Sequence, residues 1–239
     1  MESAYRYCEQ LVRAADKDRF LSALFAPAER RDALFALYAF DIEVAGVRQR
    51  VREPMAGEVR LQWWREAIGG ERAGEAAANP VATALLDTVA RCALPIEPLL
   101  KLIEARAFDL YDDAMPSLAA FDAYLDATSS ALIALAGRIL AGNHPAIEDA
   151  ARPAGRAYAI AGLLRAPRPS LPFPDLRARA RAEFAAFEAM LPRLPAAAAP
   201  AFLPAALVPG DLADRTPAQW RRQFTLWRAA RRYAGAMKC

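Results

Sequence analysis

The sequence predicts an all-α protein, and three observations lead to that prediction. Hydrophobic residues make up 55% of the 239 residues, which is enough to form a large core. Ala, Leu, Arg and Glu dominate the composition, and these residues favour helices. Apolar side chains recur three and four positions apart, whereas the alternating β-branched runs that are typical of strands are missing. We therefore expect one helical domain over residues 1–239.

Turn signals divide the chain into helices, which follow one another with short connections. Proline is tolerated at the start of a helix, and Pro27 stands near such a start. Pro54 separates two helices, and Gly69-Gly70 ends the helix that contains two adjacent tryptophans. The segment Gly142–Pro145 is a turn. The expected helices span about residues 2–15, 18–26, 28–51, 57–69, 79–93, 96–114, 117–141, 145–166, 175–192, 197–208 and 216–235.

The expected helix over residues 117–141 indicates where the core lies. Ser117 precedes it and is a suitable N-cap, because its hydroxyl accepts a bond from a free backbone N–H. Its second half, SSALIALAGRILAG, is small and apolar on nearly every face. A helix that is apolar all round is buried on all sides. We therefore place this helix at the centre of the bundle.

Residues 166–175, APRPSLPFPD, differ from the chain around them. Four prolines in this segment exclude a helix, because proline lacks the backbone N–H that a helix interior needs. We expect a proline-rich loop here, which either connects two helices or crosses the mouth of the bundle.

Composition excludes several classes of protein. The three cysteines are far apart with no CxxC pair, which speaks against a zinc site or a disulfide framework and favours a reducing compartment. The single histidine, His144, lies in a turn, so Ser/His/Asp catalysis and His-ligated metals are not expected. The N-terminus has no signal peptide pattern, and no run of about 18 uncharged apolar residues predicts a membrane span. No recognised nucleic-acid-binding motif accompanies the net charge of +3, so we expect no nucleic-acid partner.

Residues 215–239 predict a basic amphipathic C-terminal helix. Trp220, Phe224 and Trp227 are spaced four and three apart, which places them on one helix face. Two interpretations stay open: the helix lies on an anionic membrane, or it packs its aromatic residues onto the bundle with its arginines outward. The residues expected at a membrane or partner surface are Trp220, Arg221, Arg222, Trp227, Arg228, Arg231 and Arg232.

One acidic group, in FDLYDD, has the spacing of a metal site. Asp109 and Asp113 are four apart and Asp109 and Asp112 are three apart, so a helix would present them on one face. These three aspartates are our candidate catalytic residues. The competing interpretation is an acidic helix end with Asp112 and Asp113 in solvent.

Four segments resemble the squalene/phytoene synthase family and occur in the family's order: Phe20–Phe40, Leu61–Gly70, Leu102–Asp113 and Ala157–Arg165. The resemblance implies a helical bundle of the isoprenoid synthase type around a central cavity. Active members condense two prenyl diphosphates head to head, with Mg²⁺ held by two acidic motifs on facing helices. The resemblance gives the following candidate residues for a ligand cavity: Tyr38, Asp41, Glu43, Arg48 and Arg165.

The first acidic motif is missing here. The matching positions are Ala45, Gly46 and Gln49, none of which carries a charge. The nearest acids, Asp41 and Glu43, are two residues apart, about 200° around a helix, so they cannot share one metal face.

The second acidic motif is missing as well. It should follow Arg165, where Ala166 and Ser170 stand at the matching positions and prolines interrupt the helix. The loss of both motifs argues against ordinary chemistry with diphosphate and magnesium.

Within the family, the chain most resembles the branch with eroded metal motifs that includes the mitochondrial complex I assembly factor. That likeness implies a non-catalytic protein that acts in assembly of a membrane complex or in lipid or isoprenoid binding. The implied partners are a membrane-complex subunit, an isoprenoid or lipid, or an anionic membrane surface, and no cofactor is expected. The implied location is the cytoplasm or the inner face of the inner membrane. The alternative is a prenyltransferase with an atypical metal site, which would require Mg²⁺.

Overall fold

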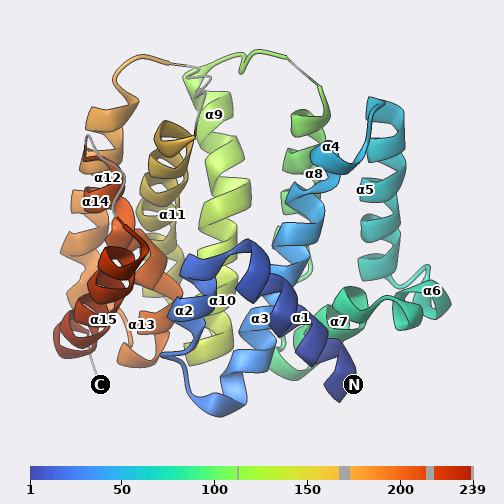
Figure 1. Cartoon of the computed structure of the whole chain (residues 1–239), viewed down its shortest axis with the longest axis horizontal. Coiled ribbons are helices and arrows are strands. Elements are labelled where there is room, and N and C mark those ends of the chain that lie inside the picture. Colours follow the sequence, from blue (N-terminus) through green and yellow to red (C-terminus); the bar gives the residue numbers. More distant parts are fainter. Residues whose placement is uncertain (112, 167–172, 214–217, 238–239) are drawn as a thin grey trace. The chain divides into compact units, whose positions relative to one another are not determined.

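The computed structural model describes residues 1–111, 113–166, 173–213 and 218–237, which form helices and no strand (Figure 1). The all-α prediction is confirmed. Contacts divide the chain into two compact units. Unit 1 comprises residues 1–20 and 27–114, and unit 2 comprises residues 21–26 and 115–239. Whether the two behave as one domain stays a prediction, and each unit is described by itself.

Unit 1 is organised around α3 (Ala28–Ala45), which contacts α1, α7 and α8. Every residue of α3 from position 33 to position 41 is buried, because the stretch ALFALYAF is apolar on all sides. A helix of this composition must be covered all round. The other helices are α1 (Glu2–Ala15), α2 (Lys17–Ala23, which ends in unit 2), α4 (Val47–Arg50), α5 (Pro54–Gly69), α6 (Ala73–Ala78), α7 (Pro80–Cys92), α8 (Glu97–Ala107) and η1 (Phe108–Leu110).

The single helix expected over residues 28–51 is wrong, because it is interrupted at Gly46. A Cβ atom at this position would lie 2.9 Å from the Ile42 carbonyl oxygen and 3.0 Å from Nη2 of Arg50. Those contacts are closer than a real Cβ normally makes, so the turn between α3 and α4 favours glycine. The chain then leaves the helix at Val51, which is extended.

Unit 2 is organised around α11 (Pro145–Arg165), which contacts α10, α12 and α14. Its buried face is rich in alanine and carries Gly155, so neighbouring helices approach its backbone closely. The other elements are α9 (Leu118–Leu125), η2 (Asp126–Ser130), α10 (Ala131–Ala141), α12 (Leu176–Met190), η3 (Leu191–Arg193), η4 (Ala196–Ala198), α13 (Ala199–Phe202), η5 (Leu203–Leu207), α14 (Val208–Asp211) and α15 (Gln219–Ala236).

The helix expected over residues 117–141 is present, but a π-helical turn, η2, divides it into α9 and α10. Thr128 Oγ1 donates to the Tyr124 carbonyl (2.7 Å), and Ser130 Oγ donates to the Arg152 carbonyl (3.0 Å). Hydroxyls that bond to backbone carbonyls in this way stabilise irregular helix turns. The expected N-cap is confirmed, because Ser117 Oγ accepts from the Ala120 N–H at 3.1 Å.

The run Leu118–Ala141 is also the one helical segment among the described residues that is long and apolar enough to cross a membrane. Half of its apolar window is buried inside the chain, as is usual for the core helix of a globular bundle. The packing of α10 against α11 accounts for its apolar composition without a membrane.

Residues 191–211 form a series of short turns instead of the single helix expected over 197–208, which is therefore wrong. Pro195, Pro200, Pro204 and Pro209 recur every four to five residues, and each removes a backbone donor. The segment is nevertheless in the core. Phe202 stacks on Phe187 of α12 with ring centroids 5.5 Å apart.

Candidate functional site

The position expected for the first acidic motif carries no carboxylate. Ala45 ends α3, and Gly46 and Gln49 follow in the turn and in α4. The guanidinium of Arg50 lies where a side chain at position 46 would begin. Arg50 also pairs with Glu43, with Nη1 and Oε2 2.5 Å apart. An arginine and its partner therefore fill this end of α3.

Asp41, one turn earlier, belongs to a network of acids and arginines in unit 1. Arg19 Nη1 lies 3.1 Å from Asp16 and 2.9 Å from Asp41. Arg106 Nη2 lies 3.5 Å from Asp41, and its Nη1 lies 3.2 Å from Asp109. The side chain of Asp41 is only 7% exposed, so its negative charge is compensated by guanidinium groups and hardly at all by water. We call these five residues the Asp41 network.

The other cavity candidates lie beside this network or in unit 2. Tyr38 is buried on α3, where burial raises the pKa of its phenol, and the Arg19 guanidinium lies 5.7 Å from its ring centroid. Arg48, on α4, is half-buried. Arg165 belongs to unit 2, whereas the other four candidates belong to unit 1. A ligand cavity lined by all five residues therefore stays a prediction.

The acidic group in FDLYDD does not form the helix face that its spacing suggested. The helix α8 ends at Ala107, and after the short turn η1 the chain is extended at Tyr111. Asp109 and Asp113 therefore do not lie on one helix. The prediction that they share a metal-binding helix face is wrong. Asp109 pairs with Arg106, Asp113 is exposed, and Asp112 lies outside the described residues.

The side chains at the two motif positions do not fit a cluster of divalent cations. Mg²⁺ requires oxygen ligands, usually from carboxylates. In the described ranges, no three acidic, His or Cys side chains are grouped to hold a metal, and the acids near α3 already contact arginines. At the second motif, Ala166 follows the last residue of α11 and is no longer helical. Ser170 lies outside the described residues, as does most of the proline-rich loop.

Arg165, which is 31% exposed, pairs with a buried carboxylate in unit 2. Its Nη1 lies 2.9 Å from Asp211 at the end of α14, and Arg222 of α15 contacts the same carboxylate. The side chain of Asp211 is 1% exposed and that of Arg222 is 6% exposed. The expectation that Arg222 belongs to a membrane or partner surface is therefore corrected: its guanidinium is needed to neutralise a buried carboxylate.

A second charged group was missed by the sequence prediction. Asp122 and Asp126 are four apart, and both contact Arg156 of α11, with two bonds of 2.7 Å to Asp126. Asp126, followed by Asp122 and Glu183, raises the pKa of the Arg156 guanidinium. Arg179 of α12 contacts Asp122 and Glu183 as well. The i, i+4 spacing was visible in the sequence, but the arginines that occupy both carboxylates come from other helices.

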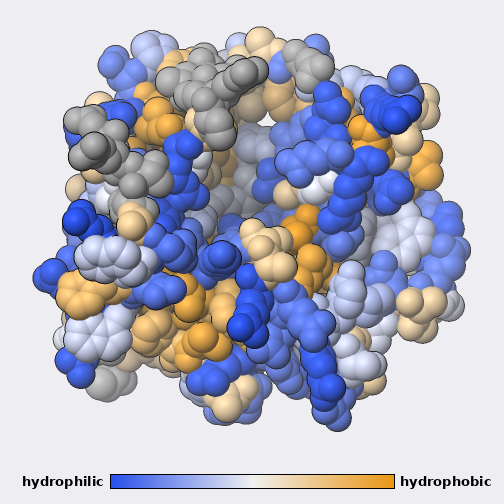
Figure 2. Space-filling model, viewed as in Figure 1, coloured by the Kyte–Doolittle hydropathy of each residue, from blue (hydrophilic) through white to orange (hydrophobic). Residues whose placement is uncertain are grey.

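The helix α15 presents one aromatic and arginine-rich face to solvent. Trp220, Phe224 and Trp227 are 63%, 52% and 43% exposed, respectively. The guanidinium of Arg221 lies 5.1 Å from the Trp220 ring, and that of Arg231 lies 4.4 Å from the Trp227 ring. Figure 2 shows blue, pale and orange side chains alternating over α15 at the lower left. We call these five residues the α15 face.

The opposite side of α15 is the side that packs. Its buried residues are Arg222, Leu226, Ala229 and Tyr233. The interpretation in which Trp220, Phe224 and Trp227 pack onto the bundle is therefore wrong, because Leu226 and Tyr233 are the residues buried there. The remaining residues expected at this surface, Arg228 and Arg232, are exposed.

The family model for squalene/phytoene synthase matches residues 12–169. The chain belongs to the squalene/phytoene synthase family. Two solved structures share the fold of this family member. A dehydrosqualene synthase in complex with ligand has a TM-score of 0.78 and 14% identity, with 98% of each chain covered. The squalene synthase HpnC from Alicyclobacillus acidocaldarius has a TM-score of 0.65 and 19% identity, with 97% of this chain and 94% of that chain covered. The isoprenoid synthase fold is confirmed, and at these identities the likeness concerns the fold alone.

This squalene/phytoene synthase family member is similar in sequence to two kinds of curated protein. The NADH dehydrogenase (ubiquinone) complex I, assembly factor 6 of Bos taurus is 34% identical over 161 residues, 67% of this chain and 48% of that protein. The Homo sapiens protein of the same name is 33% identical over 160 residues, with the same shares. A 15-cis-phytoene synthase from Synechococcus elongatus is 29% identical over 113 residues, 46% of this chain and 35% of that protein. The likeness to the assembly-factor branch is confirmed, and the chain spans about half the length of those relatives.

Proposed function

We propose that the chain is a non-catalytic member of the squalene/phytoene synthase family that acts in assembly of a membrane complex of the complex I type. The observation that carries the proposal is the Asp41 network, in which arginines already neutralise the acids nearest the missing first motif. The relatives named as complex I assembly factors support the same function.

The chemistry of the family explains why this network matters. Ionisation of a prenyl diphosphate releases a highly charged leaving group, which hard divalent cations stabilise through carboxylate ligands. In unit 1, Arg106 lies between Asp41 and Asp109, so a metal ion would have to displace a guanidinium to reach either carboxylate. Two cations cannot share that space, because like charges at short distance repel.

The catalytic half of the proposal is tested with labelled farnesyl and geranylgeranyl diphosphates. We expect the purified chain to release no diphosphate with or without Mg²⁺, under conditions in which a dehydrosqualene synthase releases it. Release that depends on Mg²⁺ would show the alternative, a prenyltransferase with an atypical metal site. Binding of the prenyl diphosphates without release of diphosphate would support a role in lipid or isoprenoid binding.

The assembly half is tested in the organism that encodes the chain. Deletion of its gene should reduce the amount of intact complex I on native gels, together with NADH:ubiquinone activity in membranes. The wild-type gene should restore both. Normal complex I after deletion would remove the assembly proposal, whatever the outcome of the diphosphate assay.

We further propose that the α15 face binds the anionic surface of the membrane on which assembly takes place. Tryptophan rings are suited to the membrane–water boundary, and arginines are attracted to anionic headgroups. The face carries both, and the packed side of α15 is already used within unit 2. In this location the protein would be peripheral on the inner face of the membrane.

A double variant, Trp220→Ser and Trp227→Ser, should bind vesicles containing phosphatidylglycerol about tenfold more weakly than the wild type, because two rings can no longer enter the interface. The matched control is Met55→Ser, which removes a 74% exposed apolar side chain from α5. Co-sedimentation with vesicles measures the effect. Equal binding of the wild type and the double variant would contradict membrane binding by this face. If the wild type bound neutral phosphatidylcholine vesicles as well as vesicles containing phosphatidylglycerol, the preference for an anionic surface would be contradicted.

A further inference from the structure

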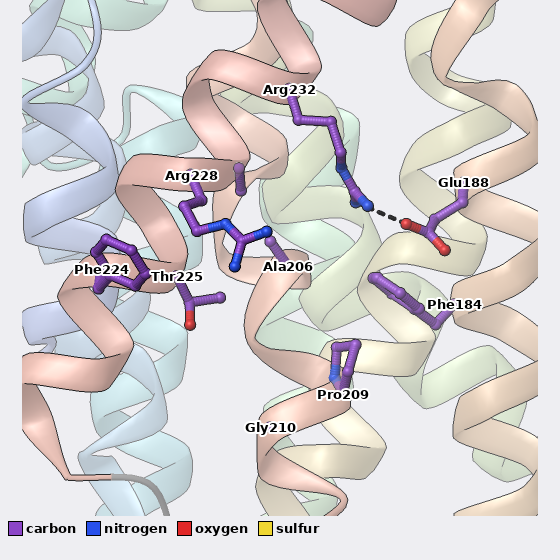
Figure 3. Close-up of a pocket in the computed structure, with 10 residues that line it drawn as sticks. Phe184, Glu188, Ala206, Pro209, Gly210, Phe224, Thr225, Arg228 and Arg232 are labelled. Carbon is purple, nitrogen blue, oxygen red and sulfur yellow. Dashed lines mark hydrogen bonds and ion pairs between the residues drawn. The ribbon is translucent and has the colours of Figure 1, made fainter.

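A cavity of about 670 Å³ opens in unit 2 between α12, α15 and the turns that precede Asp211 (Figure 3). Its volume falls in the range of sites for small molecules, roughly 300–1,000 Å³. The cavity lies within unit 2 and contains none of the residues that match the family's acidic motifs.

Much of the wall is apolar. Phe184 comes from α12, Ala206 and Pro209 come from the short turns, and Phe224 and Ala229 come from α15. In Figure 3, Phe184 and Pro209 stand on the side of the cavity that faces α15. Such walls fit an apolar chain or ring, because burial of apolar surface is favourable.

The charges of the ionised side chains that line the cavity do not sum to zero. Arg232 pairs with Glu188 at 2.6 Å, so these two charges neutralise one another. Arg228 has no ion pair with any residue that the structure describes, and its guanidinium points into the cavity (Figure 3). Among the described residues, the cavity therefore has one positive charge with no acidic partner.

Hydrogen-bond donors in the wall also point to Arg228. The Thr225 hydroxyl already donates to the Arg221 carbonyl at 2.9 Å, so it can offer only a lone pair to a ligand. The planar guanidinium of Arg228 offers several N–H groups in a fixed geometry that suits phosphate and carboxylate.

We propose that this cavity binds an amphipathic anion, a molecule with an apolar body and a phosphate or carboxylate group, and that Arg228 binds the anionic group. The apolar walls would hold the body, and the ion pair of Arg232 and Glu188 would close the polar end. The cavity shares Phe224 with the α15 face, but it requires neither the α15 tryptophans nor the Asp41 network, so it can be tested separately from the proposed assembly function.

Octyl phosphate, below its micelle concentration, is the probe, with binding measured by calorimetry on the full chain. Inorganic phosphate tests the headgroup alone, and octylamine carries the same body with a positive charge. We expect saturable binding of octyl phosphate, binding of inorganic phosphate at least about tenfold weaker, and no saturable binding of octylamine.

Two substitutions on the same helix separate the site from general charge on α15. Arg228→Gln should weaken binding of octyl phosphate about tenfold or more, because it removes the charged donor. Arg221→Gln removes an arginine that lies over Trp220 outside the cavity, and should change binding less than about twofold. Ala206→Leu, which fills the apolar wall without a change in charge, should weaken octyl phosphate and leave the affinity for inorganic phosphate unchanged.

Three results would overturn the proposal. Octylamine that binds as tightly as octyl phosphate would show a purely apolar groove. Inorganic phosphate that binds as tightly as octyl phosphate would show that no apolar body is recognised. Equal effects of Arg228→Gln and Arg221→Gln would show that only the overall charge of α15 matters. None of these results bears on the vesicle or complex I experiments, so the two proposals fail separately.

Discussion

Replacement of Asp211 by Ala is expected to lower the free energy of unfolding by about 3–5 kcal/mol. The Asp211 carboxylate is 1% exposed and contacts Arg165 and Arg222, which belong to α11 and α15. Removal of the carboxylate takes from Arg222, itself 6% exposed, the acidic group that it contacts in the core. The same change also removes the side chain that joins the C-terminal helix to α11.

Urea unfolding measured by circular dichroism would give this difference. The control is Glu188→Ala, which breaks a pair between α12 and Arg232 of α15, the helix that also carries Arg222. The side chains of this pair are 56% exposed at Arg232 and 37% exposed at Glu188. Exposed pairs contribute about 0–1 kcal/mol, so the control should lose no more than that. A loss below about 1 kcal/mol for Asp211→Ala would mean that water replaces the carboxylate. The stabilising role of the buried pair Asp211–Arg222 would then have to be abandoned.

Gly155→Ala is expected to destabilise the fold by about 3 kcal/mol, because overpacking forces backbone to move. A Cβ at position 155 would lie 2.4 Å from Cα and 2.5 Å from N of Ser130, in the π-helical turn. Both atoms belong to the backbone, so no side-chain rotation relieves the clash. The helix α11 would have to move away from η2.

The same helix provides a matched control for this substitution. Gly162 is also on α11, and a Cβ there meets no atom within 4 Å. Gly162→Ala should stabilise the protein by up to about 1 kcal/mol, the difference in helix propensity. Thermal and urea unfolding of both variants would measure the contrast. Equal stability of the two variants would show that η2 adapts freely to α11.

Much of the fold could be predicted from hydrophobic spacing and turn residues. The helices that begin at Glu2, Ala28 and Pro145 and the buried helix before Gly142 follow directly from those signals. The break at Gly46 could not be predicted in this way, since a glycine inside a helical pattern is often tolerated. The space that an added Cβ would lack there, beside the carbonyl of Ile42 and the side chain of Arg50, is visible only in the folded chain.

The irregular elements of unit 2 had weaker signals. The π-helical turn depends on a close approach of Gly155 to Ser130, which no local pattern reports. The short turns over residues 191–211 did have a signal, in prolines that recur too often for one helix. That signal was outweighed by the helix-favouring alanines between the prolines.

The candidate sites show the same division between local and long-range information. The absence of carboxylates at Ala45, Gly46 and Gln49 is evident from the sequence. The partners of Asp41 are not, because Arg19 and Arg106 lie 22 and 65 positions away in the chain. Pairing between distant helices depends on tertiary packing and has no periodicity that a single sequence reveals.

The burial of Arg222 could have been predicted. It shares a helix face with Leu226, Ala229 and Tyr233, at the spacings of four, three and four that mark a packed stripe. An arginine on such a stripe needs an acidic partner, and Asp211 is nearby in the sequence.

In the Asp41 network, the positive charges that compensate Asp41 belong to the chain itself. Where Mg²⁺ is the counter-ion of clustered carboxylates, the balance depends on the concentration of that ion and disappears with a chelator. Here the counter-charges are Arg19 and Arg106, which are part of the polypeptide and cannot dissociate. A metal centre at Asp41 would therefore require the removal of arginines as well as the introduction of acids. Removal of the arginines would leave the Asp41 carboxylate, whose side chain is only 7% exposed, without the positive charges that compensate it. The network thus opposes the binding of a metal ion at Asp41.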